Sequence, residues 1–252
     1  MKSHRLPAVK LWVGTSGFGY KEWRGKFYPP RFPAKEMLRF YASRFAAVEI
    51  NNSFYRLPNE SVLQSWAEQV PAEFRFVLKA PRRITHTKRL KDAGAEVEDL
   101  FSVAKAIGSS RGAVLFQLPP NFKNDIERLR IFLSLLPADR HVAFEFRHPS
   151  WLDEEVFALL RAHNCALCVA DTDESESCEL INTASWGYLR LRRRDYRGAD
   201  LLRWKERICS QAWDHAYVFF KHEDEATGPK FANEFLQIGG VVRRSHRASM
   251  KG

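Results

Sequence analysis

Eight short apolar runs recur along this chain, and each of them ends on a polar or charged residue. The runs are LWVGTSG (11–17), VEINNSF (48–54), FRFVLKAP (74–81), GAVLFQLPP (112–120), HVAFEFRHPSW (141–151), CALCVADTD (165–173), GYLRLRRR (187–194) and AYVFFKHED (216–224). Successive runs begin about 20–40 residues apart, which is the length that a strand, a crossover helix and two turns require. Because parallel strands are buried on both faces, they read as continuous apolar runs, as most of these do. The pattern predicts a single TIM-like (β/α)8 barrel.

Polar residues at the ends of these strands form the candidate site. In a (β/α)8 barrel, ligands bind at the carboxyl ends of the strands, which meet at one rim. The candidates there are Thr15, Ser16, Glu49, Asn51, Lys79, Gln117, Glu145, Arg147, Asp171, Arg190, Arg192, Lys221 and His222. A chain built for stability alone has no reason to place charge at so many strand ends, so we expect a functional pocket.

The barrel should occupy residues 11–240, with an N-terminal arm at 1–10 and a basic tail at 241–252. Helical patterns lie between the runs, at 36–46, 59–70, 96–108, 124–137, 151–164, 199–213 and 229–239. The segment 174–186 has no helical stripe, so we expect an irregular crossover between strands six and seven. A doubly wound sheet is the rival fold, but GTSGFG (14–19) lacks the glycine spacing of its phosphate-binding turn.

Composition limits the setting of the protein. The chain has 19 Phe and 7 Trp and is 45% hydrophobic, which is enough for a large core. The N-terminus lacks an apolar signal region and no run of 18 apolar residues exists, which disfavours secretion and membrane spanning. The four cysteines suggest a reduced, cytoplasmic protein. Cys165 and Cys168 lie within one predicted strand and point to opposite faces, so we expect them to be structural.

The net charge of +10 suggests an anionic partner. Two basic runs, 81–91 and 190–197, follow strand ends, and a third, 243–251, lies in the tail. Each run could also be an ordinary solvated surface. The two runs at the rim favour a phosphorylated small molecule or a nucleic acid as the ligand.

Glu145 and Arg147 form the densest polar motif, in the sequence E-F-R-H. Strand alternation places them on one side, and Glu49 and Asn51 repeat this arrangement. Glu49 and Glu145 could be the paired carboxylates of an acid/base hydrolysis. A structural ion pair across the barrel mouth is the alternative.

Further candidates could move protons or bind a metal. Lys79 could bind an anion, neutralise a carboxylate or act as a base, and His86 and His148 could carry protons. The two glutamates, Asp171 and a histidine (His148 or His222) could hold a divalent metal. Because no metal-binding spacing supports this, we expect no cofactor, and no serine or cysteine triad can be assigned.

Six motifs lie in order along nearly the whole chain: GTSGFGYKEWRGKFYP (14–29), EINNSFYRLP (49–58), FVLKAP with ITH (76–86), LFQLPPNF (115–122), EFRHPSW (145–151) and YVFFKH (217–222). Together they resemble the YecE-like family, also called domain of unknown function 72. The resemblance implies a TIM-barrel-type fold with a polar pocket at the strand ends, and it brings no settled reaction. Where many members carry an Arg-aromatic-His-Gly segment, this chain has RLRRR (190–194), and Lys221–His222 replaces paired asparagines. Both departures make the expected pocket more basic.

We therefore expect a hydrolase, or a related acid/base enzyme, that acts on an anionic, phosphate-bearing ligand. Glu49, Glu145 and Asp171 would handle protons, and the lysines and arginines of the rim would hold the anion. The rival is a non-catalytic nucleic-acid-binding protein that uses the basic rim, the tail and exposed aromatic side chains of Tyr20, Trp23 and Tyr28. A scaffold without catalysis stays open, as does the oligomeric state.

Overall fold

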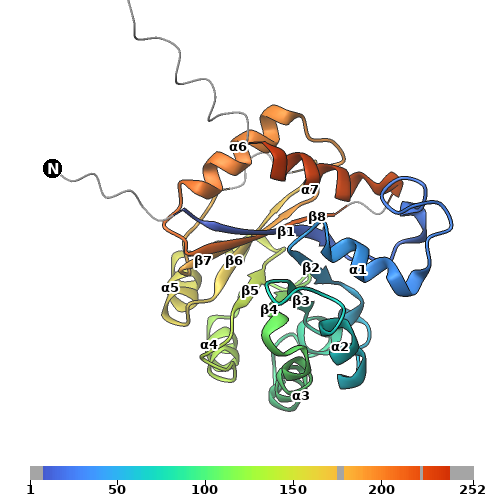
Figure 1. Ribbon diagram of the computed structural model, residues 1–252. Helices are drawn as coiled ribbons and strands as arrows, with labels where there is room; N and C mark the ends of the chain where they lie inside the picture. The colour runs from blue at the N-terminus through green and yellow to red at the C-terminus, as the bar shows by residue number, and fades with distance from the viewer. Residues whose placement is uncertain (1–7, 175–178, 222–223, 239–252) are drawn as a thin grey trace, which may run out of the picture.

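Eight parallel strands close into a barrel in the computed structural model, which describes residues 8–174, 179–221 and 224–238 (Figure 1). Strand β1 pairs with both β2 and β8, which closes the ring. The strands are β1 (Lys10–Ser16), β2 (Ala47–Ile50), β3 (Arg75–Lys79), β4 (Arg111–Gln117), β5 (Val142–Glu145), β6 (Ala166–Asp171), β7 (Trp186–Leu191) and β8 (His215–Phe220). The predicted (β/α)8 fold is confirmed.

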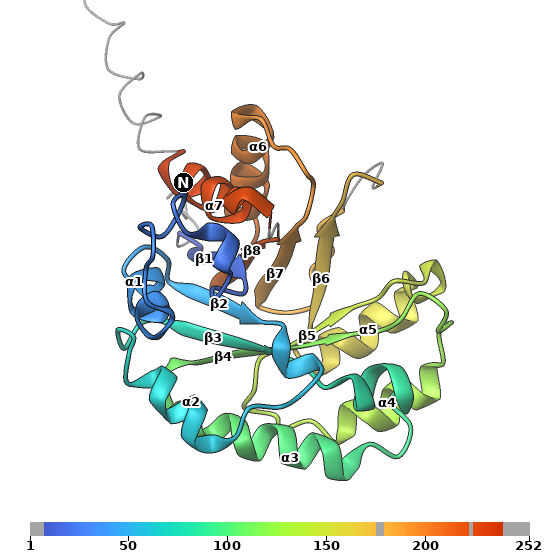
Figure 2. The ribbon, with the colours of Figure 1, turned by 90° about the vertical axis from the view of Figure 1, so that its right-hand side faces the viewer.

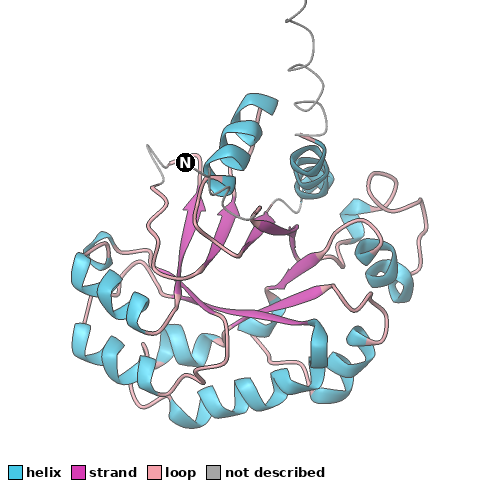
Figure 3. Cartoon of the chain, turned by 60° about the vertical axis from the view of Figure 1, so that its left-hand side comes forward, coloured by secondary structure: helices cyan, strands magenta, loops and turns pink. Residues whose placement is uncertain are grey.

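Helices surround the barrel in Figure 3, and Figure 2 shows α2, α3, α4 and α5 lining its lower outer side. They are α1 (Met37–Ala42), α2 (Glu60–Ala67), α3 (Gly94–Ala104), α4 (Ile126–Ser134), α5 (Glu154–Ala162), α6 (Gly198–Cys209) and α7 (Thr227–Gln237). Asn59 caps α2 by accepting a hydrogen bond from the backbone N–H of Val62. The described residues between β6 and β7 contain no helix, which confirms the irregular crossover. No helix within the described ranges is long and apolar enough to cross a membrane.

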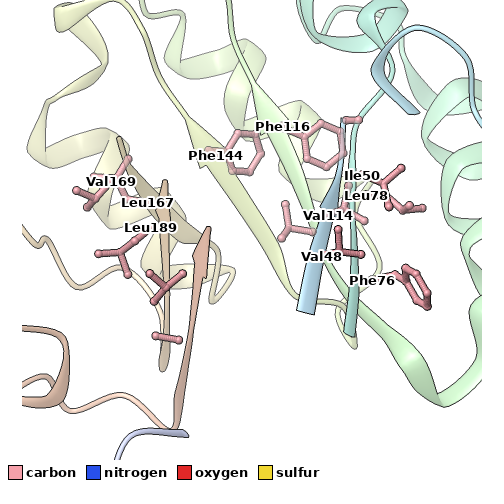
Figure 4. Packing of buried hydrophobic residues seen from close by; sticks show 14 of the residues in the cluster. Val48, Ile50, Phe76, Leu78, Val114, Phe116, Phe144, Leu167, Val169 and Leu189 are labelled. Carbon is pink, nitrogen blue, oxygen red and sulfur yellow. The ribbon is translucent and has the colours of Figure 1, made fainter. Parts of the chain in front are cut away.

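The strands are buried on both faces, and their alternation separates two apolar layers. The outer layer packs between the strands and the helices, where Figure 4 shows Val48, Phe76 and Phe144. The inner layer fills the barrel with large aromatic side chains from β1, β7 and β8 and with alanines from β2, β4, β5 and β6. Cys165 belongs to the outer layer and Cys168 to the inner layer, as the two-residue period predicts.

Toward the carboxyl ends of the strands, the inward-facing positions change from apolar to polar side chains. On β2, Glu49 lies two residues after the inward-facing Ala47, and on β3, Lys79 lies two residues after the inward-facing Val77. The barrel mouth is therefore polar because the same faces that pack the barrel interior change to charged residues at their last position. Of the predicted terminal segments, residues 1–7 and the tail 241–252 lie outside the described residues, and Lys10 already belongs to β1.

Candidate active site

One guanidinium, that of Arg190, joins two buried carboxylates at the barrel mouth. Its Nη2 donates a hydrogen bond to Glu49 Oε1 at 2.9 Å, and its Nη1 donates to Glu145 Oε2 at 2.5 Å. The three side chains are at most 2% exposed. Arg190 comes from β7, and the two glutamates come from β2 and β5. The ion pairs thus connect strands on different sides of the barrel.

Glu49 receives two further hydrogen bonds. Ser16 Oγ donates to its Oε1 at 2.7 Å, and the Tyr188 hydroxyl donates to its Oε2 at 2.6 Å. Burial acts to raise the pKa of Glu49, but the charge of Arg190 and these donors outweigh it, so the pKa lies below its usual value. Glu49 is therefore ionised at neutral pH.

Glu145 likewise accepts three hydrogen bonds, counting that from Arg190, and has Arg192 as a further ion-pair partner. Gln117 Nε2 donates to Oε2 at 2.8 Å, Arg147 Nε donates to Oε1 at 3.1 Å, and Arg192 Nη1 lies 3.8 Å from Oε1. Burial again acts to raise its pKa, and the charges of Arg190 and Arg147 lower it far below the usual range. Hydrolysis by paired carboxylates needs one protonated acid, whereas this network favours two ionised groups.

Lys79 differs from the arginines because its amine is not paired with a carboxylate. Among the described residues it forms no ion pair within 4.0 Å, and its Nζ lies 4.0 Å from the centroid of the Phe54 ring. Burial and the charge of Arg190 lower the pKa of Lys79 to about 8. Lys79 can therefore lose its proton near neutral pH.

The two predicted histidines have different surroundings. His86 lies with its ring 4.9 Å from Phe54, and its Nδ1 is 2.9 Å from Thr85 Oγ1. Burial and the charge of Lys79 lower the pKa of His86 to about 4, so its ring is neutral at neutral pH. His148 Nδ1 accepts a hydrogen bond from the backbone N–H of Ser150 and thereby caps the short turn that follows β5. His148 thus has a local structural role through its Nδ1.

Asp171 and Thr15 do not share the mouth, which corrects their predicted place. Asp171 accepts hydrogen bonds from Arg193 Nε (2.9 Å), the Tyr196 hydroxyl (2.9 Å) and Trp204 Nε1 (3.0 Å). Asp171 is two residues after Val169 and so faces outward from the barrel, into the layer between the sheet and α6. Tyr196 and Trp204 lie in that layer. Thr15 likewise bonds outward, to the hydroxyl of Tyr41 at 2.9 Å.

The aromatic loop after β1 is packed against the barrel. Trp23 and Tyr28 are each 1% exposed, so the prediction of exposed aromatic side chains there is wrong. The half-buried Tyr20 donates a hydrogen bond to the Ser16 carbonyl at 2.7 Å, and its ring lies 4.8 Å from that of Trp23. The loop reaches this position through Gly17, whose φ of 95° favours glycine. Trp23 therefore supports the loop and does not reach the ligand side.

Two other predicted ligand residues lie at the rim. Asn51 lines a recess of about 150 Å³ together with Gly17, Tyr20 and Trp66. The half-buried Lys221 follows β8, and its backbone N–H donates to the Leu191 carbonyl at 3.2 Å. His222 lies outside the described residues.

A cavity of about 560 Å³ opens beside Glu145. Arg147 and Arg192 line it, and within the described part of the chain Arg192 Nε is buried without a hydrogen-bond partner. The other lining residues are Pro120, Phe146, Ala170, Thr172, Asp173 and Glu174. The cavity therefore presents two guanidinium groups beside the paired carboxylate of Glu145, and the carboxylates of Asp173 and Glu174 lie elsewhere in its lining.

Some side chains of the two basic runs form ion pairs away from the mouth, and others point into it. In the first run, Arg83 and Lys88 both pair with Glu96 at 2.7 Å. In the second run, strand alternation turns Arg190 and Arg192 inward, while Arg193 pairs outward with Asp171. Part of the basic charge at the rim is thus balanced by carboxylates within the fold, although Arg83 and Lys88 share the single charge of Glu96.

The arrangement of Glu49 and Glu145 does not favour the alternative of a divalent metal site. No group of three or more His, Cys, Asp or Glu side chains that could hold a metal occurs in the described ranges. Arg190 lies between Glu49 and Glu145, in the position that a bridging cation would need. Tyr188, which the sequence reasoning missed, could have been found because it shares the inward phase of Arg190 on β7.

Comparisons with known proteins agree with the barrel. A family model described as "Protein of unknown function DUF72" matches residues 12–250. The UPF0759 protein YunF of Bacillus subtilis is 29% identical over 174 residues, which cover 64% of this chain and 60% of YunF. The UPF0759 protein YecE of Escherichia coli K12 is 32% identical over 115 residues, which cover 45% of this chain and 42% of YecE. The matches thus span less than two thirds of either relative.

Solved structures show the same fold. A DUF72 family protein from Thermotoga maritima superposes with a TM-score of 0.75 at 24% identity, over 90% of this chain and 98% of its own. A DUF72 family protein from Enterococcus faecalis gives a TM-score of 0.74 at 17% identity, over 94% of this chain and 100% of its own. These similarities extend over nearly the whole barrel and concern the fold alone.

Proposed function

Since the chain belongs to the family described as protein of unknown function DUF72, we propose its function from the site itself. We propose that the barrel is an acid/base enzyme that binds a small anionic ligand at its mouth. Lys79 exchanges the proton, and Arg147 and Arg192 hold the anion. Hydrolysis of a phosphate-bearing compound is one reaction of this class.

The anion site is supported by the two arginines that line the 560 Å³ cavity. Arg192 Nε has no partner among the described residues, and Arg147 is about one-third exposed, with a side-chain accessibility of 34%. Guanidinium groups bind phosphate or carboxylate through paired, charge-assisted hydrogen bonds. Since Glu145 is also bound by Arg190, it does not neutralise both of its other arginine neighbours.

The proton-transfer role falls to Lys79 because the carboxylates are held in their ionised form. An acid/base group works best when its pKa lies near the operating pH, and that of Lys79 is about 8. Glu49 and Glu145 then act by fixing Arg190 and the charge around the ligand. His86, which shares the Phe54 ring with Lys79, is the second candidate for carrying a proton.

Titration calorimetry with inorganic phosphate and a panel of phosphosugars tests the anion site. Arg192→Met should weaken binding by about 10–150-fold, as expected for the loss of charge-assisted hydrogen bonds worth about 1.5–3 kcal/mol. Arg194→Met is the matched control, because Arg194 is 89% exposed and its nearest carboxylate, that of Asp173, is 3.7 Å away. Equal effects of the two substitutions, with both variants folded, would contradict the proposed site.

The rival nucleic-acid function rests on the net charge of +10 and on the tail, which lies outside the described residues. The exposed aromatic side chains on which bases would stack are not provided by Trp23 and Tyr28, because both are buried. Titration with a short duplex at two salt concentrations separates the functions. Affinity for the duplex that falls steeply with salt and depends on residues 241–252, without any response to phosphosugars, would favour the rival.

A further inference from the structure

We propose that Lys79 is also an amine nucleophile, which forms an imine with a carbonyl group of the anionic ligand. This inference rests on the proposed anion site and names the class of compound that the site accepts. The compound carries a ketone or aldehyde carbon close to a carboxylate or phosphate. Arg147 and Arg192 line the cavity and hold the anionic end. Lys79 is not among the lining residues, so the ligand extends beyond the cavity to place its carbonyl carbon at Nζ of Lys79.

The surroundings of Lys79 differ from those of structural lysines in the same chain. Lys88 Nζ donates to a Glu96 oxygen at 2.7 Å, and Lys205 Nζ donates to the carbonyls of Phe235 and Leu236 at the end of α7. Lys79 Nζ has no such acceptor among the described residues and lies against the Phe54 ring. An amine with no carboxylate holding it in place is available for reaction.

The carboxylates of the mouth are near Lys79 but are already occupied. Glu49 accepts three hydrogen bonds, from Ser16, Tyr188 and Arg190. Glu145 is bound by several donors in the same way. Both glutamates thus have arginine as their ion-pair partner, and among the described residues neither pairs with Lys79 within 4.0 Å.

A nucleophilic amine must spend part of its time without a proton. Burial and the positive charges of Arg190 and Arg147 act on Lys79 in that direction, and its pKa of about 8 leaves an uncharged fraction at neutral pH. Desolvation and neighbouring cations are the two means by which proteins activate a lysine for imine chemistry. Both act on this residue.

The reaction balances without a metal or an oxidant. The amine nitrogen forms a bond to the carbonyl carbon, and the carbonyl oxygen takes a proton to give a carbinolamine. The carbon–oxygen bond then breaks and the oxygen leaves as water, so that an ammonium and a carbonyl compound give a protonated imine and one water. In this proposal the proton passes between nitrogen and oxygen through the neutral ring of His86, which packs on the same Phe54 as Lys79.

Reductive trapping on the full chain tests the inference. Wild-type protein is incubated with pyruvate, which carries a carboxylate, or with dihydroxyacetone phosphate, which carries a phosphate, and is then treated with sodium borohydride. Borohydride adds hydride to an imine carbon and makes the adduct permanent. We expect one adduct per chain in intact mass, mapped by peptide analysis to Lys79, with the more reactive probe showing which anionic group the arginines prefer.

Three variants supply the controls. Lys79→Arg keeps the positive charge but cannot form the imine, so it should lose the adduct, whereas Lys88→Arg should label like wild type. Arg192→Met should lower the yield of the adduct because the probe is no longer held. Peptide mapping of the wild type identifies the site even if a variant fails to fold.

The possible outcomes separate this inference from the proposed function. Adducts spread evenly over the lysines, or retained in Lys79→Arg, overturn the inference. No adduct with either probe also overturns it, and the proposed function survives if phosphate binding still depends on Arg192. Absence of both the adduct and Arg192-dependent binding removes the two proposals together.

Discussion

Arg190→Met should be the most damaging single substitution at the mouth, because it removes the cation that two buried carboxylates share. Glu145 would keep Arg147 as a partner at 3.1 Å, but Glu49 would keep only the hydroxyl groups of Ser16 and Tyr188. Breaking a buried ion pair costs about 3–5 kcal/mol, since the remaining charge is uncompensated. For a chain of this size, that corresponds to a melting temperature lower by about 6–20 °C.

The loss should depend on pH, and the sign follows from the shifted pKa values. In the wild type, the pKa values of Glu49 and Glu145 lie below their usual 4.5, so their ion pairs stabilise the fold above that pH and lose this effect as pH falls through the folded values. Without Arg190, burial should raise the pKa of Glu49 above 4.5. The deficit of the variant should therefore be largest at neutral pH and shrink towards pH 5.

Urea unfolding at pH 7 and pH 5 measures this deficit, and two further variants show its origin. Glu49→Gln in the Arg190→Met background removes the unpaired charge and should recover about 2 kcal/mol or more. Arg194→Met, at an exposed position, should stay within about 0.5 kcal/mol of wild type. A deficit that is equal at both pH values and is not relieved by Glu49→Gln would refute the ion-pair argument.

Two further substitutions test other parts of the barrel. Asp171→Asn should cost about 1.5–3 kcal/mol of stability by weakening the contacts with Arg193, Tyr196 and Trp204, and should leave phosphate affinity unchanged; a loss of affinity in the folded variant would return Asp171 to the site. Burial and His141 lower the pKa of His215 to about 4, so the unfolded chain binds a proton that the folded chain does not, and stability should fall as pH drops from about 6.5 to about 4. His215→Gln should flatten that dependence in denaturant titrations, and an unchanged slope would exclude this histidine as its source.

The strand ends could be predicted because polar or charged residues stand at the end of each apolar run in the sequence. Glu49, Glu145 and Arg190 were expected at one rim, and the structure brings them together although Glu49 and Arg190 are 141 residues apart in the chain. The topology of the barrel supplies this closeness, because neighbouring and opposing strand ends share one mouth. The hydrogen bonds that Glu49 accepts from Ser16 and Tyr188, and that Glu145 accepts from Gln117, depend on a geometry that the spacing of residues in the sequence does not reveal.

The inward or outward phase of a strand was less predictable. A strand buried on both faces has no apolar–polar alternation, so CALCVADTD does not show whether Ala170 or Asp171 faces the barrel interior. The same ambiguity placed Thr15 at the mouth. The burial of Trp23 and Tyr28 was missed for a related reason, since a loop's aromatic residues are buried by contacts with segments distant in sequence.

Charge balance at the mouth suggests what kind of ligand suits the proposed site. Glu49 and Glu145 contribute two negative charges, and Arg190 and Arg147 contribute two positive charges at close range. Arg192, which lies 3.8 Å from Glu145, and Lys79 then add positive charge that these two glutamates do not balance, while Asp173, paired with Arg194, and Glu174 lie elsewhere in the cavity lining. A neutral ligand would leave these groups uncompensated as it displaced water, whereas a carboxylate or phosphate would neutralise them. Under the proposed function, selectivity should therefore be decided mainly by the charge of the ligand and only then by its shape.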